Sequence, residues 1–253
     1  MEINLTPVDK KRTKCSDCAI RRLSLFKELS KIELDDKDAI HSAQYKIQAK
    51  KILYKEGSIP EDIYTIYHGW VLQYKALSNG KRQVLKVALP GDLVGFQTDA
   101  NGALTHTSMT LSNTILCALP ISSVRDSFKE YPALADRMTQ MHARDMSICQ
   151  NHLIGVGQKS AEERIAYLCM EIYSRVKMIH EETVDNNIEF PLTQEEIGDA
   201  VGLTQIHVNR TLKSLREKGL LEIKGKRLYI LNKAGLKDLG SFDESVLDIH
   251  SFF

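Results

Sequence analysis

Two closely spaced helix-start signals in the C-terminal third constrain this chain most. Thr193-Gln194-Glu195-Glu196 is a capping box, because the Thr193 hydroxyl can accept from the amide of residue 196 while Glu196 reaches back to the Thr193 amide. Gly202 then supplies a tight turn, Thr204 can cap a second helix, and Gly219 ends that helix. Two helices joined by a short glycine turn predict a helix-turn-helix.

The second of these helices is expected to have one buried side. Val208, Leu212 and Leu215 share a face at helical spacing and should pack inside. The other faces carry polar, cationic and exposed apolar side chains. These candidate contact residues are Gln205, Ile206, Asn209, Arg210 and Lys213.

A hairpin with a local excess of positive charge follows. The runs Leu220–Ile223 and Arg227–Leu231 are β-like, and Lys224-Gly225-Lys226 joins them as a wing. The whole chain has a net charge of +1, but residues 204–233 hold eight basic and two acidic residues, an excess of six. Such a patch favours binding to nucleic-acid phosphates. An ordinary solvated basic face would not be accompanied by two helix caps, a glycine turn and a basic wing. The region therefore predicts a winged helix-turn-helix that binds double-stranded DNA.

The chemistry of the exposed side chains suggests how each would contact DNA. Arg210 is the candidate for bidentate contact with guanine, Asn209 for contact with adenine or a phosphate, and Ile206 for contact with a thymine methyl group. Lys213, Lys224, Lys226 and Arg227 are better placed as phosphate anchors.

Residues 21–121 show the pattern of a small β-structure. Short runs rich in Tyr, Ile and Val are separated by turn signals, the clearest being Ser78-Asn79-Gly80-Lys81 and Pro90-Gly91-Asp92. Ser108–Leu119 is expected to form one further strand. This spacing predicts a β-barrel or β-roll. With 253 residues and 43% apolar content the chain can build two cores, so the predicted fold class is α+β.

Between these regions the apolar period becomes that of a helix. A row with alternating spacings of four and three runs along it: Leu134, Met138, Met141, Asp145, Ile148 and His152. This row could pack on the core of its own domain or form a two-chain coiled coil. We favour the homodimer, in which the polar Asp145 and His152 would fix the register. A second helix is expected at about residues 161–177.

The predicted organisation has a leader, three structured regions and a tail. The tail is short and acidic, and we expect it to be loosely ordered. No apolar run is long enough to span a membrane, and the first 14 residues lack the apolar core of a secretory signal, so a cytoplasmic protein without a membrane partner is expected. The divisions are residues 1–20 (leader), 21–121 (β-roll), 122–182 (dimerisation helix and following helix), 183–239 (winged helix-turn-helix, beginning with a polar connection over 183–190) and 240–253 (tail).

Several motifs together resemble the Crp/Fnr superfamily over about residues 15–239. Gly57, Tyr64 and Gly69-Trp70-Val71 resemble its glycine-marked β-roll, and Leu89–Gly95 resembles its Pro-Gly-Asp-x-x-Gly turn. Leu192–Gly198, Gly202-Leu203-Thr204 and Arg210 resemble its helix-turn-helix. The resemblance implies a cyclic-nucleotide-binding-like β-roll, a long dimerisation helix and a DNA-binding domain that reads a palindromic operator, with RNA polymerase as a partner. It implies no enzyme activity.

Two departures from the family pattern bear on ligand and operator. The family's cyclic-nucleotide site has Gly-Glu followed by Arg-Ser, whereas this chain has Gly95-Phe96-Gln97 and His106-Thr107-Ser108, so cyclic AMP is not expected to bind. Members of the Crp and Fnr kind carry Glu at the position of Ile206, and Fnr has Ser at that of Asn209. The resemblance therefore does not transfer their base preference to this chain.

The leader cysteines also resemble those of Fnr. Cys15 and Cys18 match its Cys-x-x-Cys pair and Cys117 matches its distant cysteine, but Ser24 stands where a third leader cysteine is expected. A cubane iron–sulfur cluster normally takes four thiolates, and serine oxygen is a poorer ligand for its iron. The resemblance thus implies a metal site at Cys15, Cys18 and Cys117 that is one thiolate short.

Three hypotheses for the cysteines stay open. One is an iron–sulfur cluster that senses oxygen, nitric oxide or redox state, with Ser24, Asp17 or an exogenous thiol as substitute ligand. Another is a thiol–disulfide switch among the same cysteines. The last is a cofactor-free regulator controlled by its abundance, as in FixK-like members. Cys149 and Cys169 lie on expected helices, where packing is their expected role, although Cys149 could also form a disulfide between subunits.

Two other function classes are less favoured. A thiol oxidoreductase built on Cys15 and Cys18 would need a βαβ context after the motif, and a β-roll pattern follows instead. A regulator that binds haem or a metabolite in the β-roll could use His41, His68 or His106 as ligands.

Overall fold

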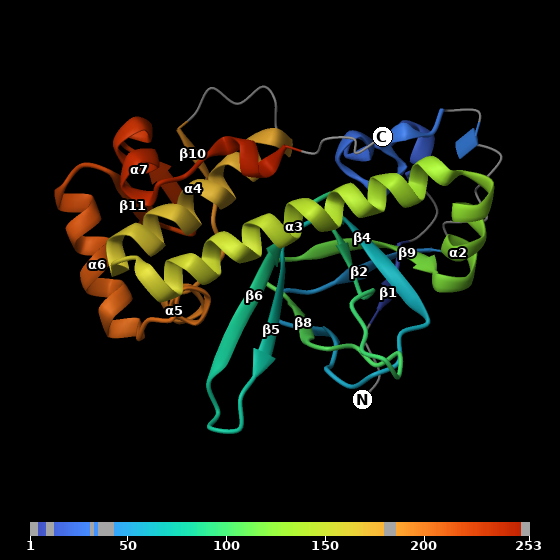
Figure 1. Cartoon of the computed structure of the whole chain (residues 1–253), viewed down its shortest axis with the longest axis horizontal. Coiled ribbons are helices and arrows are strands. Elements are labelled where there is room, and N and C mark those ends of the chain that lie inside the picture. Colours follow the sequence, from blue (N-terminus) through green and yellow to red (C-terminus); the bar gives the residue numbers. More distant parts are fainter. Residues whose placement is uncertain (1–4, 9–12, 31–32, 35–42, 180–185, 249–253) are drawn as a thin grey trace. The chain divides into compact units, whose positions relative to one another are not determined.

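The computed structural model describes residues 5–8, 13–30, 33–34, 43–179 and 186–248 (Figure 1). Contacts divide the chain into two compact units. The first is built mainly from residues up to Ala76 and from Val87–His142, and the second from Leu77–Lys86 and the residues after Ala143. The predicted α+β class is confirmed: a strand-rich N-terminal part, long helices and a C-terminal helix-turn-helix are all present.

The strands of the N-terminal part form two antiparallel sheets. One has the order β1 (Thr6–Pro7), β2 (Ala43–Ile47), β9 (Thr114–Pro120), β4 (Asp62–His68) and β7 (Leu93–Val94). The other has the order β3 (Ile52–Tyr54), β8 (Thr107–Thr110), β5 (Val71–Ala76) and β6 (Arg82–Ala88).

The run Ser108–Leu119 is two strands, where the sequence predicted one. The chain leaves β8 at Leu111, whose amide donates to the carbonyl of Trp70, and β9 starts at Thr114 in the other sheet. Asn113 lies in this turn and its side chain accepts from the amide of Ala49. The break lets one apolar run supply strands to both sheets.

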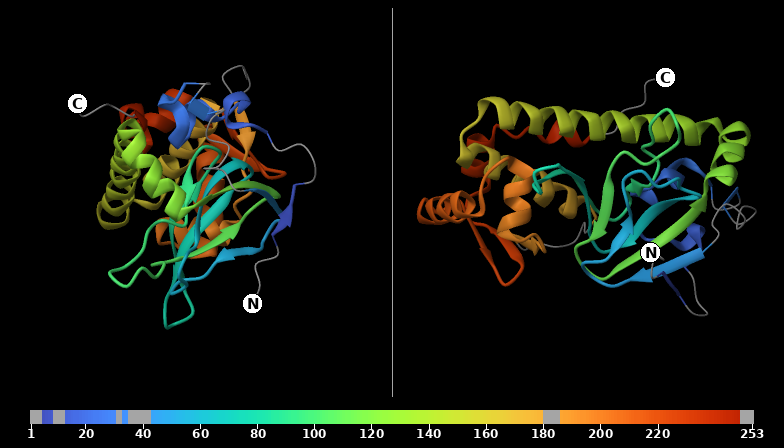
Figure 2. Two further views of the ribbon diagram at one scale, coloured as in Figure 1. Left: turned by 90° about the vertical axis from the view of Figure 1, so that its right-hand side faces the viewer. Right: turned by 90° about the horizontal axis from the view of Figure 1, so that it is seen from below.

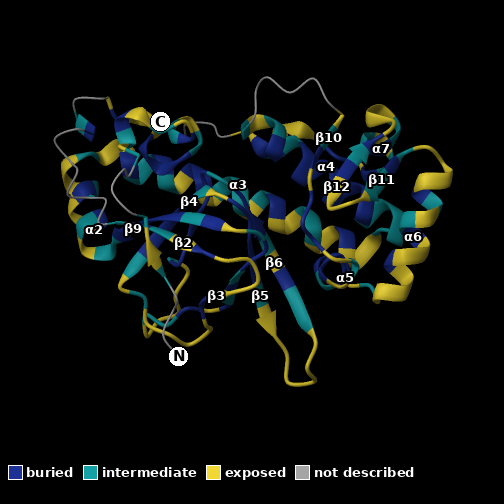
Figure 3. Cartoon of the chain, turned by 180° about the vertical axis from the view of Figure 1, so that it is seen from behind, coloured by how far each residue is buried: buried dark blue, intermediate teal, exposed yellow. Residues whose placement is uncertain are grey.

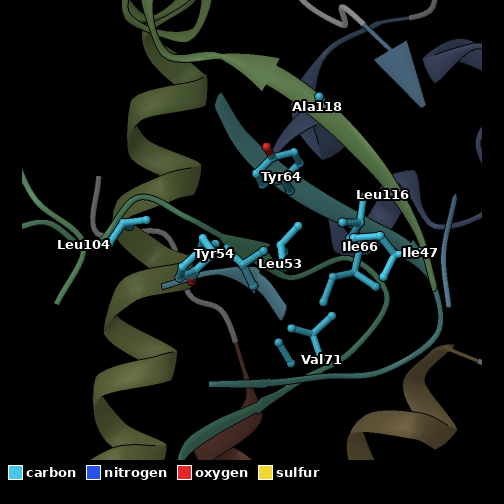
Figure 4. Close-up of a cluster of buried hydrophobic side chains, with 11 residues drawn as sticks. Ile47, Leu53, Tyr54, Tyr64, Ile66, Val71, Leu104, Leu116 and Ala118 are labelled. Atoms are coloured by element: carbon cyan, nitrogen blue, oxygen red, sulfur yellow. The ribbon is translucent and has the colours of Figure 1, made fainter. Parts of the chain in front are cut away.

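Apolar side chains from both sheets form one cluster (Figure 4). Leu53, Ile66, Val71 and Leu116 are fully buried in it. Figure 4 shows them pointing toward one another from β3, β4, β5 and β9. Burial on this scale stabilises the roll by about 1.5–3 kcal/mol per large side chain. The other members are Ile47, Tyr54, Tyr64, Ala88, Val94, Leu104 and Ala118.

The leader cysteines lie in short 3-10 helices. These are η1 (Cys15–Asp17), η2 (Arg21–Leu23) and η3 (Leu25–Glu28). Leu25, Phe26 and the following Leu29 are buried, so this segment belongs to the apolar core of the first unit.

Three helices follow the sheets: α2 (Ile121–Glu130), α3 (Pro132–Gln158) and α4 (Ala161–Ile179). The long α3 is uninterrupted in every view (Figure 2). None of the described helices is long and apolar enough to cross a membrane.

The predicted dimer row on α3 is largely engaged within the single chain. Leu134, Met141 and Ile148 of the predicted row are buried within the single chain. Asp145 is paired with Lys86 at 2.5 Å. Of the remaining members, Met138 is half-buried, and the His152 Nε2 lies 3.4 Å from the Glu171 Oε2. The row one residue later has the same heptad spacing and is exposed throughout: Thr139, His142, Met146, Cys149, Leu153 and Val156.

The C-terminal part consists of helices and a three-stranded sheet. Helix α5 (Gln194–Val201) and helix α6 (Gln205–Glu217) precede α7 (Lys233–Gly240) and η4 (Glu244–Leu247). The sheet has the antiparallel order β10 (Asn187–Glu189), β12 (Arg227–Ile230) and β11 (Leu221–Lys224).

Two expectations for this part are corrected. Residues 183–190 were expected to be a polar connection, but their described part includes β10, where Ile188 and the adjacent Phe190 are buried. The tail from residue 240 was expected to be loosely ordered. Its described part instead buries Phe242 and Leu247, and the Phe242 ring stacks edge-on against Tyr167 of α4. A few apolar residues in a polar tail were enough to anchor it.

Candidate DNA-binding surface and cysteine pocket

The first helix of the helix-turn-helix begins at the predicted capping box. The Thr193 hydroxyl accepts from the Glu196 amide at 3.2 Å, and the Glu196 carboxylate accepts from the Thr193 amide at 2.8 Å. At the other end Gly202 has φ +71°, a left-handed conformation that favours glycine. Thr204 then caps α6 by accepting from the His207 amide at 3.3 Å. All three local predictions are confirmed.

Helix α6 buries one face and exposes the other. Val208, Thr211 and Leu215 are buried, while the predicted Leu212 is only half-buried. Every predicted contact residue of this helix is exposed, as the outer side of α6 shows (Figure 3): Gln205, Ile206, Asn209, Arg210 and Lys213. Ile206 is 75% exposed, which is unusual for so apolar a side chain and suits contact with an apolar group outside the chain.

The wing ends in a tight turn between β11 and β12. Lys224 faces Arg227 across the hairpin, so Gly225 and Lys226 form a two-residue loop with φ of +59° and +58°. Both values fit a type I′ turn. Lys226 has no side-chain partner among the described residues, and the same is true of Arg210 and Lys224.

Other cations of the basic region are partly engaged within the chain. The Lys218 Nζ donates to the Glu162 carboxylate at 2.7 Å, and this bond, together with one from Ser214, holds the pKa of Glu162 below its ordinary value. The Arg227 Nε donates to Asn187 of β10 at 2.8 Å, which orients this wing residue. The lysines at the tip of the wing, together with Arg210 and Arg216 of α6, have no such side-chain partner among the described residues.

A hairpin segment of the second unit contacts α5. The Arg82 guanidinium lies 2.8 Å from the Asp199 carboxylate and 3.8 Å from that of Glu195. Gln83 donates to the carbonyl of Ala200 at 3.3 Å. Burial raises the pKa of Asp199, and Arg82 offsets part of that rise. No local pattern predicts this contact, because Arg82 and Asp199 are 117 residues apart.

The leader cysteines and Cys117 line one pocket. Its walls also include Ser24 and the buried Thr65; the full lining is Cys15, Cys18, Ile20, Arg21, Ser24, Phe26, Thr65 and Cys117. Cys117 is buried on β9 and its Sγ accepts from Gln44 at 3.4 Å. Burial raises the pKa of the Cys18 thiol, while backbone hydrogen bonds from Ile20 and Arg21 offset part of the rise.

Ser24 does not have a spare hydroxyl. Its Oγ donates to the Arg21 carbonyl at 2.9 Å and accepts from the Phe26 amide at 3.3 Å, which makes it the N-cap of η3. Its role as a substitute ligand is therefore disfavoured, because binding iron would break this cap. Asp17, the other side chain considered, is not among the pocket's lining residues.

The side chains that line the pocket are of the type that binds a thiolate-ligated group. Three thiols line it, and the buried Thr65 hydroxyl has no hydrogen-bond partner among the residues that the structure describes, so it can donate to an occupant. The thiols are not assembled around a point, since no group of three or more His, Cys, Asp or Glu within the described ranges is placed to hold a metal ion. Iron would have to draw the thiols together and displace their protons.

Comparisons with known proteins find a known domain in each half of the chain. The model of a Crp-like helix-turn-helix domain matches residues 163–239, and that of a cyclic nucleotide-binding domain matches residues 45–131. The "Fumarate and nitrate reduction regulatory protein" of Escherichia coli (strain K12) is 27% identical over 232 residues, 92% of each chain. The "Anaerobic regulatory protein" of Pasteurella multocida (strain Pm70) is 27% identical over 225 residues, 89% of this chain and 82% of the relative. The solved structure of FixK2 from Bradyrhizobium japonicum has a TM-score of 0.69 and 26% identity, and covers 78% of this chain and 96% of that one.

The chain belongs to the Crp/Fnr family. Members of this family are DNA-binding transcription regulators that act as dimers, and the matching models and relatives are those of regulators and not of enzymes. The helix-turn-helix model of this Crp/Fnr regulator starts to match at residue 163, inside α4.

His106, which stands in the stretch compared with the family's nucleotide site, is buried in this Crp/Fnr regulator. His106 is 2% exposed, and its Nε2 lies 2.8 Å from the Tyr54 hydroxyl, which also accepts from Gln73 at 3.1 Å. Such a buried, mutually bonded cluster is typical of a satisfied polar core. Of the other histidines considered as haem ligands, His68 is exposed and His41 lies outside the described residues.

Two residues of the candidate DNA-binding surface were not predicted from the sequence. Gln194 starts α5, and its Oε1 accepts from the Asn209 Nδ2 at 3.2 Å. His207 is exposed on α6 next to Ile206. Gln194 had been considered only as part of the capping box, and the contact with Asn209 depends on the angle between two helices. Cys149 is also exposed on α3, where packing was expected, whereas Cys169 is buried as expected.

Proposed function

We propose that this Crp/Fnr regulator binds a palindromic operator as a homodimer and communicates with RNA polymerase, under control of the cysteine pocket. The observation that carries the proposal is the exposed face of α6 beside a wing whose lysines have no side-chain partner in the part of the chain that the structure describes. A helix of this length with an exposed polar and cationic face fits the major groove, and a hairpin wing fits the flanking backbone.

The contact residues divide by chemistry. Arg210 is proposed to read guanine through two parallel hydrogen bonds, Asn209 to read adenine, and Ile206 to contact a thymine methyl group. Gln205 lies in the first turn of α6, where base edges and backbone are both within reach. The remaining cations anchor phosphates: Lys213, Lys224, Lys226 and Arg227. The Asn187 bond restricts Arg227 to one side of the wing.

The exposed row of α3 is the proposed dimer seam. Met146 is 59%, Leu153 72% and Val156 40% exposed, which is unfavourable for a helix that has no partner. Their spacing of three and four suits a parallel coiled coil, and Cys149 lies in the same row. A two-fold dimer places its half-sites about one DNA turn apart.

Cys149 gives a direct test of this seam. Mild oxidation removes two electrons and two protons from a pair of facing thiols and joins them as a disulfide. We expect a covalent dimer of the wild type on a nonreducing gel and none for Cys149→Ser, whereas Cys169→Ser, which removes a buried thiol, serves as the matched control and still cross-links. A wild type that does not cross-link while it sediments as a dimer would exclude this register.

The cysteine pocket is the proposed sensor. Cys15, Cys18 and Cys117 would hold an iron–sulfur cluster, with an exogenous thiol as the fourth ligand because the Ser24 hydroxyl caps η3. When bound, the cluster supplies a centre that oxygen or nitric oxide destroys. The chain's own contribution is to hold the three sulfurs in an apolar pocket and to offer the Thr65 hydroxyl as a donor. The name of the Pasteurella relative, "Anaerobic regulatory protein", is consistent with an oxygen signal.

A second candidate for the sensor is a thiol–disulfide switch. The presence of two leader thiols and Cys117 in the lining of one pocket favours it, since exchange among them needs no metal. An effector in the β-roll is less supported, because Tyr54, Gln73 and His106 bond to one another there.

The experiment is anaerobic purification with iron, sulfide and thiol assays, followed by exposure to air while DNA binding is recorded on a palindromic operator. Iron and sulfide in stoichiometric amounts, with operator binding lost in air, would support the cluster. Metal-free protein that loses two thiols in air and recovers with dithiothreitol would support the disulfide switch. Binding that ignores air would refute both and leave a regulator set by its abundance or by another ligand. Cys18→Ala should abolish the cluster and its response to air, while Cys169→Ala should not. For a disulfide switch, Cys117→Ala abolishes the response only where Cys117 is one of the two thiols lost.

A further inference from the structure

A hydrogen bond joins the two helices of the helix-turn-helix on their exposed side. The Asn209 Nδ2 donates to the Gln194 Oε1 at 3.2 Å, across 15 residues of sequence. Gln194 is the first residue of α5 and Asn209 is exposed in the second turn of α6. The capping box of Thr193 and Glu196 fixes the backbone that carries the Gln194 side chain.

This bond leaves part of the Asn209 amide available. A carboxamide has two N–H donors and one oxygen acceptor. One N–H is used by Gln194, so one N–H and the oxygen remain for DNA. In the major groove adenine offers an N7 acceptor beside an N6 donor, which these two groups match. Guanine offers only acceptors on this edge, cytosine only a donor, and thymine an acceptor and a methyl group, so each leaves a group of Asn209 unmatched.

We propose that Gln194 is a positioning residue that fixes the Asn209 amide in the orientation that selects adenine. The inference rests on the proposed function, since it concerns how the same surface reads a base. An unrestrained amide can rotate by half a turn and exchange its donor and acceptor sides. With the Gln194 oxygen facing Asn209, the Asn209 nitrogen lies on the Gln194 side and its oxygen on the other. Ile206 and Arg210, which flank Asn209 on α6, are then set to contact neighbouring base pairs.

The test measures base preference and not affinity alone. Dissociation constants of the full-length protein are determined at one salt concentration on operators that carry each of the four base pairs at every half-site position. The base pair whose preference disappears in Asn209→Ala identifies the position that Asn209 reads. There we expect the wild type to prefer adenine by about 5- to 150-fold, the range of one bidentate contact.

Two variants of Gln194 separate positioning from backbone contact. Gln194→Ala should reduce the adenine preference at that position at least about threefold and leave the preference elsewhere unchanged. Gln194→Glu retains an oxygen acceptor, so the preference should be kept, while the added negative charge weakens binding to all operators equally. The double variant Gln194→Ala/Asn209→Ala should have the same base preference at that position as Asn209→Ala alone. Thermal unfolding of each variant checks the fold.

Several results would overturn the inference. If Gln194→Ala loses affinity by one common factor on all operators, Gln194 contacts only a phosphate and does not position Asn209. A wild-type preference for guanine, cytosine or thymine at the Asn209 position also contradicts it. A wild type that binds no operator sequence-specifically refutes the proposed function, and this inference with it.

Discussion

Replacement of Lys224 and Lys226 by alanine is expected to lower the salt dependence of DNA binding. Both side chains are exposed at the wing and have no partner among the described residues, so both can neutralise phosphates. Each neutralised phosphate contributes about 0.9 to the slope of log K against log salt concentration. A dimer carries both lysines twice, so about four contacts are lost and the slope falls by roughly 3.6.

This change is large enough to measure. When the salt concentration doubles, the wild type should lose about twelvefold more affinity than the double variant, because two raised to the power 3.6 is roughly twelve. The assay is fluorescence anisotropy of a labelled operator over a salt series. The matched control is Lys75→Ala/Lys129→Ala, which removes the same charge from residues of β5 and α2 that are paired with Glu56 and Asp126. An unchanged slope in the wing variant, or an equal change in the control, would refute the argument from direct contact.

Four further predictions follow from the same structure. Thr193→Ala removes a cap of α5 and should lower the free energy of unfolding by about 1 kcal/mol in urea titrations; no change would mean that the capping box is redundant. Glu162→Gln should weaken the loss of stability at acid pH, because the folded-state pKa of Glu162 is lowered. The stabilisation by the Glu162 carboxylate is complete above the ordinary pKa of 4.5 and is lost as the pH falls below it. Plots of unfolding free energy against pH that stay parallel for wild type and variant would contradict this. Leu247→Ala should cost about 2–5 kcal/mol of unfolding free energy if the tail is anchored as its burial indicates, and a cost near zero would show that it is not. Leu153→Lys should shift the protein toward monomer in sedimentation experiments while Ser122→Lys on α2 does not, and a dimer that persists would exclude the exposed row of α3 as the seam.

The helix-turn-helix could be predicted in detail because its signals are local. Thr193 and Glu196 satisfy each other's backbone within one turn of helix, and Gly202 has the left-handed φ that its position after α5 requires. The exposed face of α6 follows from helical spacing once the helix is placed. These features depend on residues a few positions apart, so tertiary structure had little left to decide.

Helix α3 shows what apolar periodicity cannot decide. Two adjacent rows of α3 share the heptad spacing, and the predicted row, with Leu134, Met141 and Ile148, is the one buried in the single chain. A helix that packs on its own chain and on a partner needs two apolar rows. Composition cannot tell which row faces which neighbour.

Local chemistry was enough to predict the helix starts, the turns and the basic wing from the sequence. The three cysteines of the pocket were grouped by their resemblance to a family pattern. Only the tertiary structure decided that Ser24 uses its hydroxyl as a cap, that Phe242 and Leu247 anchor the tail, and that Gln194 meets Asn209. The physical reason is the same in each case. A side chain with several available partners takes the one that folding brings within about 3 Å, and that distance is set by the packing of elements far apart in the chain.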